Sequence, residues 1–198
     1  TPGGGSTPGG GSPRPAVKPA QKPETEPAVP FADVRKADWF CKDAEYVYEK
    51  GIMTGTSADN FNPHSRMTRG MIVTVLYRLA QEPAVSGAGK FADVDSAKWY
   101  GDAVAWAAAN GIAGGYSNTT FGPNDSITRE QLAAILYRYA VYSGMAAVTL
   151  EENLSGFADA GQISSYAVQA MNWAVGRGLL KVSNGRLMPG AQATRAQV

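Results

Sequence analysis

Residues 121–132 read FGPNDSITREQL, and this stretch decides how the rest of the chain is interpreted. It has an apolar residue two positions before a proline and, five positions after that proline, a Thr-Arg step. The pattern recurs at residues 61–72 as FNPHSRMTRGMI and at residues 187–198 as LMPGAQATRAQV. Such internal repetition is typical of proteins built from copies of one supersecondary unit. We therefore expect one folding unit in three copies.

Each copy also has an earlier part, which opens on Phe-Ala-Asp and runs into a helix-forming stretch. In the second copy, Ala103, Trp106 and Ala107 have the i, i+3, i+4 spacing of one apolar helix face. A glycine then closes the stretch, since a residue without Cβ readily adopts the left-handed conformation of a helix C-cap. One helix-loop-helix unit cannot bury its own apolar faces. We therefore predict an all-α fold in which three tandem units pack around a shared core.

The predicted boundaries place the repeats at residues 31–82, 91–144 and 157–198. The third copy ends three residues after its Thr-Arg step, so it reads as C-terminally truncated. Residues 1–30 hold eight of the 12 prolines together with a run of glycine and serine. This composition cannot bury enough apolar surface to fold, which predicts a disordered, flexible linker.

Charge and reactive side chains exclude several classes of function. A net charge of +1 gives no basis for binding nucleic acid or an anionic membrane surface. No apolar run approaches the roughly 18 residues of a membrane helix. Cys41 and His64 are the sole cysteine and histidine and do not recur between copies, so neither a zinc site nor a repeated catalytic centre is expected. We predict no nucleic-acid partner, no membrane insertion, no cofactor, no metal and no enzymatic activity.

The arginine of the Thr-Arg step is chemically out of place. Thr68 and Thr128 are expected helix N-caps, which puts an arginine at the first helical position, where the helix dipole disfavours a cation. One explanation is an ion pair with a carboxylate of a neighbouring copy. The other is anion recognition, in which the guanidinium and unpaired helix N–H groups converge on a carboxylate or phosphate. The arginines are Arg69, Arg129 and Arg195, and the candidate carboxylates are Asp33, Asp93 and Asp159.

Two sets of aromatic residues recur between the copies. The early set could offer ring faces to a sugar beside an arginine that holds an acidic substituent, although core packing is the favoured expectation for it. The later set lies on the apolar helix face and is expected in the core. The three aspartates are expected to serve turns or caps rather than a ligand. The early set is Trp39, Trp99 and Tyr166, and the later set is Tyr46, Trp106 and Trp173.

Taken in order, these landmarks resemble the S-layer homology (SLH) repeat of bacterial surface proteins. The resemblance covers residues 31–198 and is strongest in the second copy, through Phe-Ala-Asp-Val at 91–94, Trp99, Gly-Ile at 111–112 and Ile-Thr-Arg-Glu at 127–130. The first copy departs from the pattern with Met-Thr-Arg-Gly. The third departs further, with Tyr166 for tryptophan and Val182 where a loop glycine is expected.

The resemblance implies a pseudo-threefold arrangement and a non-covalent anchor of an exported protein in the bacterial cell wall. SLH repeats bind secondary cell-wall polysaccharides attached to peptidoglycan, which often carry pyruvate ketals. Carried over to this chain, the Thr-Arg arginines would contact the glycan, with Arg129 ranked first, Arg69 second and Arg195 last. The implied binding residues are Arg69, Arg129, Arg195, Trp39, Trp99, Gly55, Gly115, Thr68 and Thr128.

Two alternatives remain open at this point. In the first, the repeats mediate self-association of a surface lattice and the arginines only bridge copies. In the second, the repeats anchor an exported polysaccharide-degrading enzyme whose catalytic part lies outside this chain.

Overall fold

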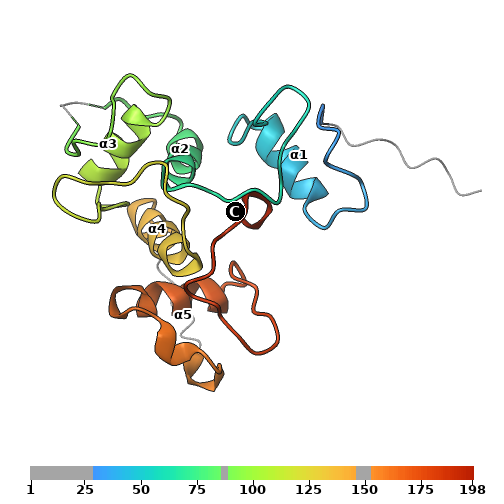
Figure 1. Ribbon diagram of the computed structural model, residues 1–198, viewed down its shortest axis with the longest axis vertical. Helices are drawn as coiled ribbons and strands as arrows, with labels where there is room; N and C mark the ends of the chain where they lie inside the picture. Colours follow the sequence, from blue (N-terminus) through green and yellow to red (C-terminus); the bar gives the residue numbers. More distant parts are fainter. Residues whose placement is uncertain (1–28, 86–88, 146–152) are drawn as a thin grey trace, which may run out of the picture.

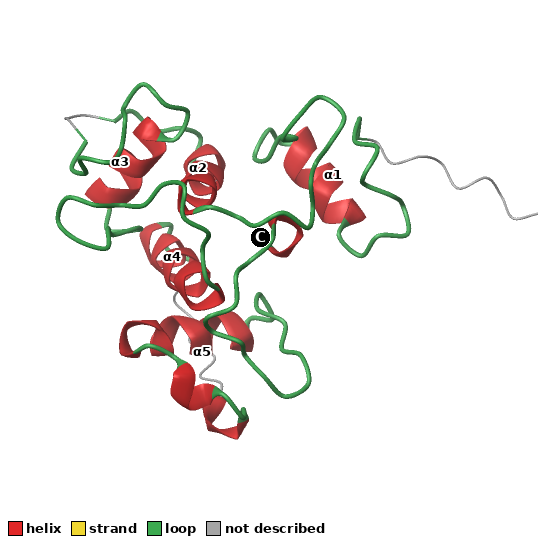
Figure 2. Cartoon of the chain, in the orientation of Figure 1, coloured by secondary structure: helices red, strands yellow, loops and turns green. Residues whose placement is uncertain are grey.

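The computed structural model describes residues 29–85, 89–145 and 153–198. The linker predicted at residues 1–30 lies outside this part of the chain, apart from residues 29 and 30. The described residues form helices and loops without a β-strand, as Figure 2 shows, which confirms the all-α prediction. The α-helices are α1 (Cys41–Glu49), α2 (Arg69–Leu79), α3 (Gly101–Ala109), α4 (Arg129–Tyr142) and α5 (Val168–Gly176). The 3-10 turns are η1 (Leu154–Gly156), η2 (Ala160–Gln162), η3 (Ser165–Ala167) and η4 (Arg195–Gln197).

The Thr-Arg step starts the second helix of each repeat, as predicted. The hydroxyl of Thr68 accepts from the Met71 amide, and that of Thr128 accepts from the Gln131 amide. In the second repeat the Gln131 side chain also accepts from the Thr128 amide, which completes the capping box. The corresponding box is present at Thr194, where the Gln197 side chain accepts from the Thr194 amide (3.0 Å), so η4 begins as α4 does.

The helices form arms that radiate from a common centre (Figure 1). Helix α2 packs against α3, and α4 packs against α5, so the second helix of one repeat pairs with the first helix of the next. Aromatic contacts fill both pairs: the Trp106 ring lies 5.5 Å from Tyr77, and the Trp173 ring lies 5.6 Å from Tyr137. The arm of α1 carries a single α-helix.

Tyr46 shows the consequence of that single helix. It was expected in the core together with Trp106 and Trp173, which are 3% and 7% exposed. The prediction is wrong for Tyr46, which is 56% exposed. By the symmetry of the repeats, the helix that would cover it starts at Arg195, and the chain has only η4 at that place.

Three main-chain hydrogen bonds join the repeats at the centre. The Met67 amide donates to the Ala193 carbonyl (2.9 Å), the Ile127 amide to the Met67 carbonyl (2.9 Å), and the Ala193 amide to the Ile127 carbonyl (3.0 Å). All three side chains are fully buried. Each repeat thus donates to one neighbour and accepts from the other, which gives the pseudo-threefold arrangement that the family resemblance implied.

Candidate ligand-binding grooves

The guanidinium group of each Thr-Arg step is buried in the next repeat. Arg195 donates from Nε to the Phe61 carbonyl (2.8 Å) and from Nη2 to the Thr54 carbonyl (2.7 Å). Arg69 and Arg129 do the same, with distances of 2.7–2.9 Å. Burial lowers the pKa of all three groups, but from so high a value that they stay charged. The acceptors are Phe121 and Gly114 for Arg69, and Leu187 and Lys181 for Arg129.

The aspartates hold the same loops from the other side. The carboxylate of Asp93 accepts from the amides of Phe121 (2.8 Å) and Gly122 (2.7 Å), so both main-chain polar atoms of Phe121 are bound. Burial raises the pKa of Asp93, but the hydrogen bonds from these two amides and from its own amide, together with the Arg69 charge, lower it, and the net pKa lies below the ordinary value. Asp33 and Asp159 make equivalent bonds. The aspartates are therefore structural, as expected, but they fix a loop 28 residues away rather than a local turn or cap.

One explanation from the sequence was an ion pair between each arginine and one of these aspartates. In the structure, both side chains bind the main chain of the same loop instead. Arginine binds the carbonyls of the loop and aspartate binds its amides. The second expectation, unpaired amides at the helix start, is wrong. The Arg69 amide donates to the Asp125 carbonyl and the Gly70 amide to the Pro123 carbonyl, and the other repeats follow suit. An anion would therefore have to be recognised by side chains.

Two grooves of the same plan lie between the arms. We call the first the α2 groove; it has a volume of about 440 Å³. The second, the α4 groove, has a volume of about 300 Å³. Each combines a loop and helix of one repeat, an aromatic residue of the next and a Thr-Arg arginine of the remaining one. The α2 groove is lined by Met53, Thr54, Gly55, Thr56, Met67, Met71, Thr74, Val75, Arg78, Trp99 and Arg195. The α4 groove is lined by Arg69, Gly114, Gly115, Tyr116, Gln131, Ala134, Ile135, Arg138 and Tyr166.

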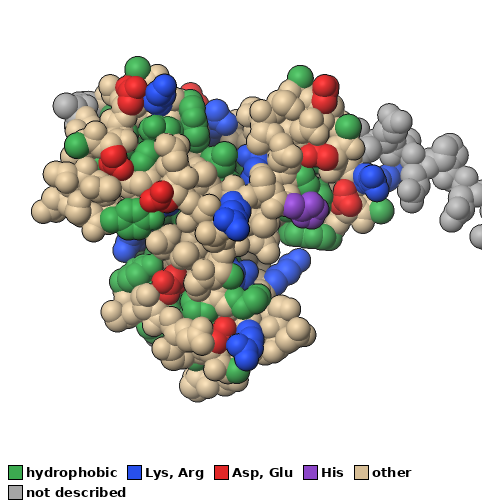
Figure 3. All heavy atoms as spheres, in the orientation of Figure 1, with side chains coloured by type: hydrophobic (Ala, Val, Ile, Leu, Met, Phe, Trp, Pro, Cys, Tyr) green, Lys and Arg blue, Asp and Glu red, His purple; other side chains and the backbone are tan. Residues whose placement is uncertain are grey.

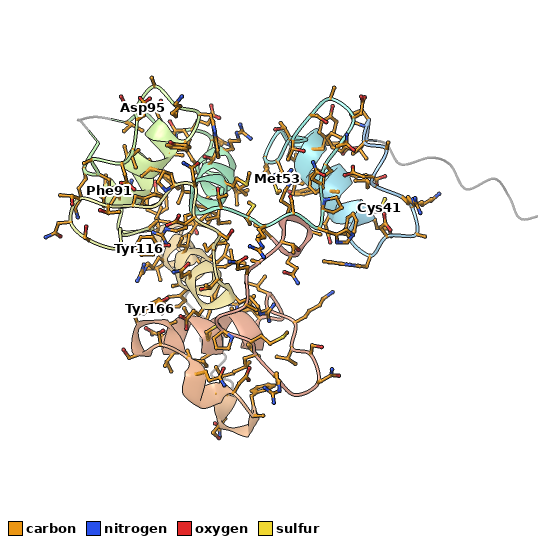
Figure 4. All side chains as sticks on the ribbon, viewed as in Figure 1. Cys41, Met53, Phe91, Asp95, Tyr116 and Tyr166 are labelled. Atoms are coloured by element: carbon orange, nitrogen blue, oxygen red, sulfur yellow. The ribbon has the colours of Figure 1, made fainter. Side chains whose placement is uncertain are left out.

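The early aromatic residues stand at the surface rather than in the core. Trp39, Trp99 and Tyr166 are 60%, 57% and 52% exposed, so the favoured expectation of core packing is wrong. Trp99 and Tyr166 occupy equivalent walls of the two grooves. Figure 4 places Tyr116 and Tyr166 together in the space between two arms, and Met53 between α1 and α2. The exposure leaves these ring faces accessible to a ligand.

Gly55 and Gly115 line the grooves and are also required by the local packing. A Cβ on Gly55 would lie 2.4 Å from the Ser57 carbonyl oxygen and 2.5 Å from the Phe31 ring. The same holds for Gly115 against Thr120 and Phe91. The third loop is built differently, because its proline follows its C-cap glycine by eleven positions rather than by twelve.

The third junction differs from the two grooves. Arg129 lies there, and Lys181 places its ammonium 5.2 Å from the centre of the Trp39 ring. The wall that α2 and α4 form elsewhere would be the helix that begins at Arg195. The structure has only η4 at that place, so the surroundings of Arg129 lack this wall, whereas Arg195 lies in the α2 groove, which has it. Arg195 and Arg69 thus line the two grooves, and the predicted order in which the three arginines contribute to binding stays a prediction.

Sequence reasoning missed three groove residues. Arg78 and Arg138 occupy equivalent positions on α2 and α4, and the repeated Leu-Tyr-Arg at residues 76–78 and 136–138 could have revealed them. Tyr116 covers the Arg69 guanidinium at 4.5 Å, with Phe121 at 4.6 Å. No repeated signal points to Tyr116, since Thr56 stands in its place in the first repeat.

The surface charges, possible metal ligands and helix lengths of the described residues suggest no further kind of site. Figure 3 shows basic and acidic side chains interspersed over the visible face, with the histidine at the surface. No group of three or more His, Cys, Asp or Glu side chains in this part of the chain could hold a metal ion. None of the described helices has the length and apolar character needed to cross a bilayer. Thr68 and Thr128 use their hydroxyls as helix caps, and a ligand contact by them stays a prediction.

Comparison with known proteins matches the chain to the family described as S-layer homology domain, at residues 30–70, 90–133 and 156–198. The chain is 34% identical over 173 residues to the Surface-layer 125 kDa protein of Lysinibacillus sphaericus, covering 85% of this chain and 14% of that protein. It is 33% identical over 171 residues to an Endoglucanase of Bacillus sp. (strain KSM-635), covering 86% and 18%. A Cellulosome-anchoring protein of Acetivibrio thermocellus is 28% identical over 116 residues, covering 56% and 26%. The chain therefore spans only a small part of each relative.

Proposed function

This chain belongs to the S-layer homology domain family, and from that premise we propose that it anchors an exported protein to the bacterial cell wall. The proposed ligand is an acidic secondary cell-wall polysaccharide linked to peptidoglycan, with a pyruvate ketal as the acidic group. The module acts at the cell surface by binding alone. The endoglucanase relative is matched over 18% of its length, so its activity is not carried over to this chain.

The observation that carries the proposal is the repeated construction of the two grooves. Each has an exposed aromatic ring on one wall, a glycine loop on another and two arginines, and neither set of lining residues includes Asp or Glu. A sugar ring can stack its C–H face on Trp99 or Tyr166 while the guanidinium groups attract a carboxylate. Arg69 and Arg195 each use two of five N–H donors on loop carbonyls, which leaves donors for the ligand.

Co-sedimentation with cell-wall sacculi tests the proposal. The chain should pellet with sacculi that carry the polysaccharide and stay in solution with sacculi stripped of it. Trp99→Ala should weaken binding, whereas Tyr46→Ala, which removes an equally exposed ring away from both grooves, should not. Equal binding to stripped sacculi would overturn the proposal.

The lattice alternative has its own signature in the same assay. A self-associating module would pellet, or scatter light more strongly with concentration, without any sacculi. The observed arginine bridges run between repeats of one chain, so they are no argument for assembly between chains.

A further inference from the structure

We infer that Arg78 and Arg138 are the side chains that bind the acidic substituent of the ligand, whereas the Thr-Arg arginines chiefly build the groove floor. This inference rests on the proposed function and names the specificity-determining residues of the same grooves. It assigns the recognition of the acidic group to a residue in the later part of the second helix of a repeat, rather than to the first residue of that helix.

The two residues occupy the same place in the fold. Arg78 lies nine residues after the first residue of α2, and Arg138 nine residues after the first residue of α4. Each lines its groove together with an aromatic residue of the next repeat, Trp99 in one case and Tyr166 in the other. Each groove therefore has a second cation besides its Thr-Arg arginine. Neither set of lining residues contains a carboxylate.

The Thr-Arg arginines have little freedom to serve a ligand. Arg195 is 7% exposed, and two bonds of 2.7–2.8 Å hold its guanidinium to carbonyls of the first repeat. Turning that group toward a ligand would leave buried carbonyls unpaired and loosen the junction between repeats. Arg195 can add charge and a remaining N–H donor, but it cannot follow the position of the ligand.

Arg78 is held far more weakly. Its Nη1 is 3.4 Å from the Ile52 carbonyl, and its Nε is 3.9 Å from the Glu82 carboxylate, which is largely exposed. An ion pair of this length at the surface contributes little. The guanidinium can therefore leave both partners for a ligand carboxylate, which it would bind through two parallel hydrogen bonds. Arg138 is exposed, so it has the same access to the α4 groove.

The two arginines of the α2 groove converge on one short loop. Arg78 reaches the carbonyl of Ile52 and Arg195 reaches that of Thr54, two residues further along. A carboxylate bound by Arg78 therefore lies in the field of both cations, while the attached sugar ring is within reach of Trp99 across the groove. This arrangement predicts that the acidic group and the sugar ring are recognised by different walls.

The test is a binding titration with polysaccharide released from sacculi, before and after mild acid hydrolysis of its ketals. The Arg78→Gln/Arg138→Gln variant should lose about tenfold or more in affinity for the untreated polysaccharide, the scale of charge-assisted hydrogen bonds. It should no longer distinguish the two forms. Arg78→Lys/Arg138→Lys should fall in between, because it keeps the charge and loses the bidentate geometry.

The control removes the same net charge elsewhere. Arg35→Gln/Lys90→Gln alters two cations outside both sets of groove residues and should bind as the wild type does. Thermal unfolding should be unchanged in the glutamine variant, since Arg78 and Arg138 make no short buried contact. Wild-type affinity in Arg78→Gln/Arg138→Gln, or a wild type that binds both forms equally, would overturn the inference. A wild type that binds neither form would instead overturn the proposed function.

Discussion

The α2 groove and the α4 groove have floors of the same construction. They differ in one residue that covers the buried arginine. In both, a buried arginine from another repeat holds the loop, and a glycine brings the loop close to a phenylalanine ring. In the α4 groove, the Arg69 guanidinium lies over two rings, at 4.5 Å from Tyr116 and 4.6 Å from Phe121. In the α2 groove, Phe61 covers Arg195 at 4.7 Å, and Thr56 stands where Tyr116 would be. Repetition thus preserves the framework and buries the two arginines almost equally, at 5% and 7% exposure, while a single loop position decides whether a tyrosine ring also covers the guanidinium.

The largest effect should come from the shared floor. Arg69→Met and Arg195→Met each remove two hydrogen bonds from a charged donor to loop carbonyls, at an expected cost of about 3–6 kcal/mol in the free energy of unfolding. The α2–α3 pairing spans the junction of Arg69, whereas α1 has no such partner at the junction of Arg195. Hydrogen exchange should therefore show α1 losing protection first in Arg195→Met. A loss below about 1 kcal/mol in urea unfolding of both variants would contradict a structural role for the arginines.

Replacing the loop glycines should cause the second-largest loss of stability. Gly115→Ala and Gly55→Ala push a methyl group against backbone oxygen and a phenylalanine ring, and overpacking of this kind costs about 1–3 kcal/mol. Gly114→Ala is the matched control, because a Cβ there meets nothing within 4 Å. The measurement is thermal unfolding. If Gly115→Ala were as stable as Gly114→Ala, the close approach of this loop to Phe91 would be refuted.

Exchanging the covering residues should change binding more than stability. Tyr116→Thr uncovers one face of Arg69 and should strengthen ligand binding at the α4 groove, whereas Thr56→Tyr should weaken it at the α2 groove. A partly exposed cation–π contact is worth roughly 0.5–1 kcal/mol, so the expected changes in affinity are a few-fold. Calorimetric titration with the released polysaccharide would measure both. Changes of the same sign in the two variants would show that access to the arginine does not distinguish the grooves.

The smallest effect should appear in acid. The folded-state pKa of Asp93 lies below its ordinary value, so its contribution to stability is complete above about pH 4 and is lost as the pH falls through the folded-state pKa. Protonation of Asp93 weakens the hydrogen bonds that its carboxylate accepts from the Phe121 and Gly122 amides. The protection of these amides, measured against the slower intrinsic exchange in acid, should fall in the wild type by more than the protection of other buried amides. Asp93→Asn should already exchange fast at neutral pH and lose this dependence.

Local rules were enough to predict much of the framework. The N-caps at Thr68 and Thr128 and the left-handed glycine that ends each first helix follow from short-range chemistry, and the structure shows each of them. Because the same residues recur at the same positions in each repeat, a pattern in one copy predicts the corresponding element in the next.

Long-range partners were what the sequence concealed. Tyr46 has the same spacing as Trp106, but burial depends on a helix from another repeat. Trp39 and Trp99 precede α1 and α3 by two residues, so helical spacing did not apply to them. The partners of the arginines are main-chain carbonyls, which every residue possesses, and no residue type in the sequence could mark them.

The cyclic hydrogen bonds of Met67, Ile127 and Ala193 give the molecule a property that linear repeat arrays lack. In a linear array each terminal repeat has one neighbour, and unfolding starts by fraying from such an end. Here the first and last repeats are neighbours at the centre, so the central hydrogen bonds have no terminal repeat from which to fray, although the α1 arm has no helix partner. Removing any one repeat breaks two of the three central bonds at once. The first repeat can therefore come loose only by breaking contacts on two sides together, which favours all-or-none resistance to a pull applied at the chain's N-terminal segment.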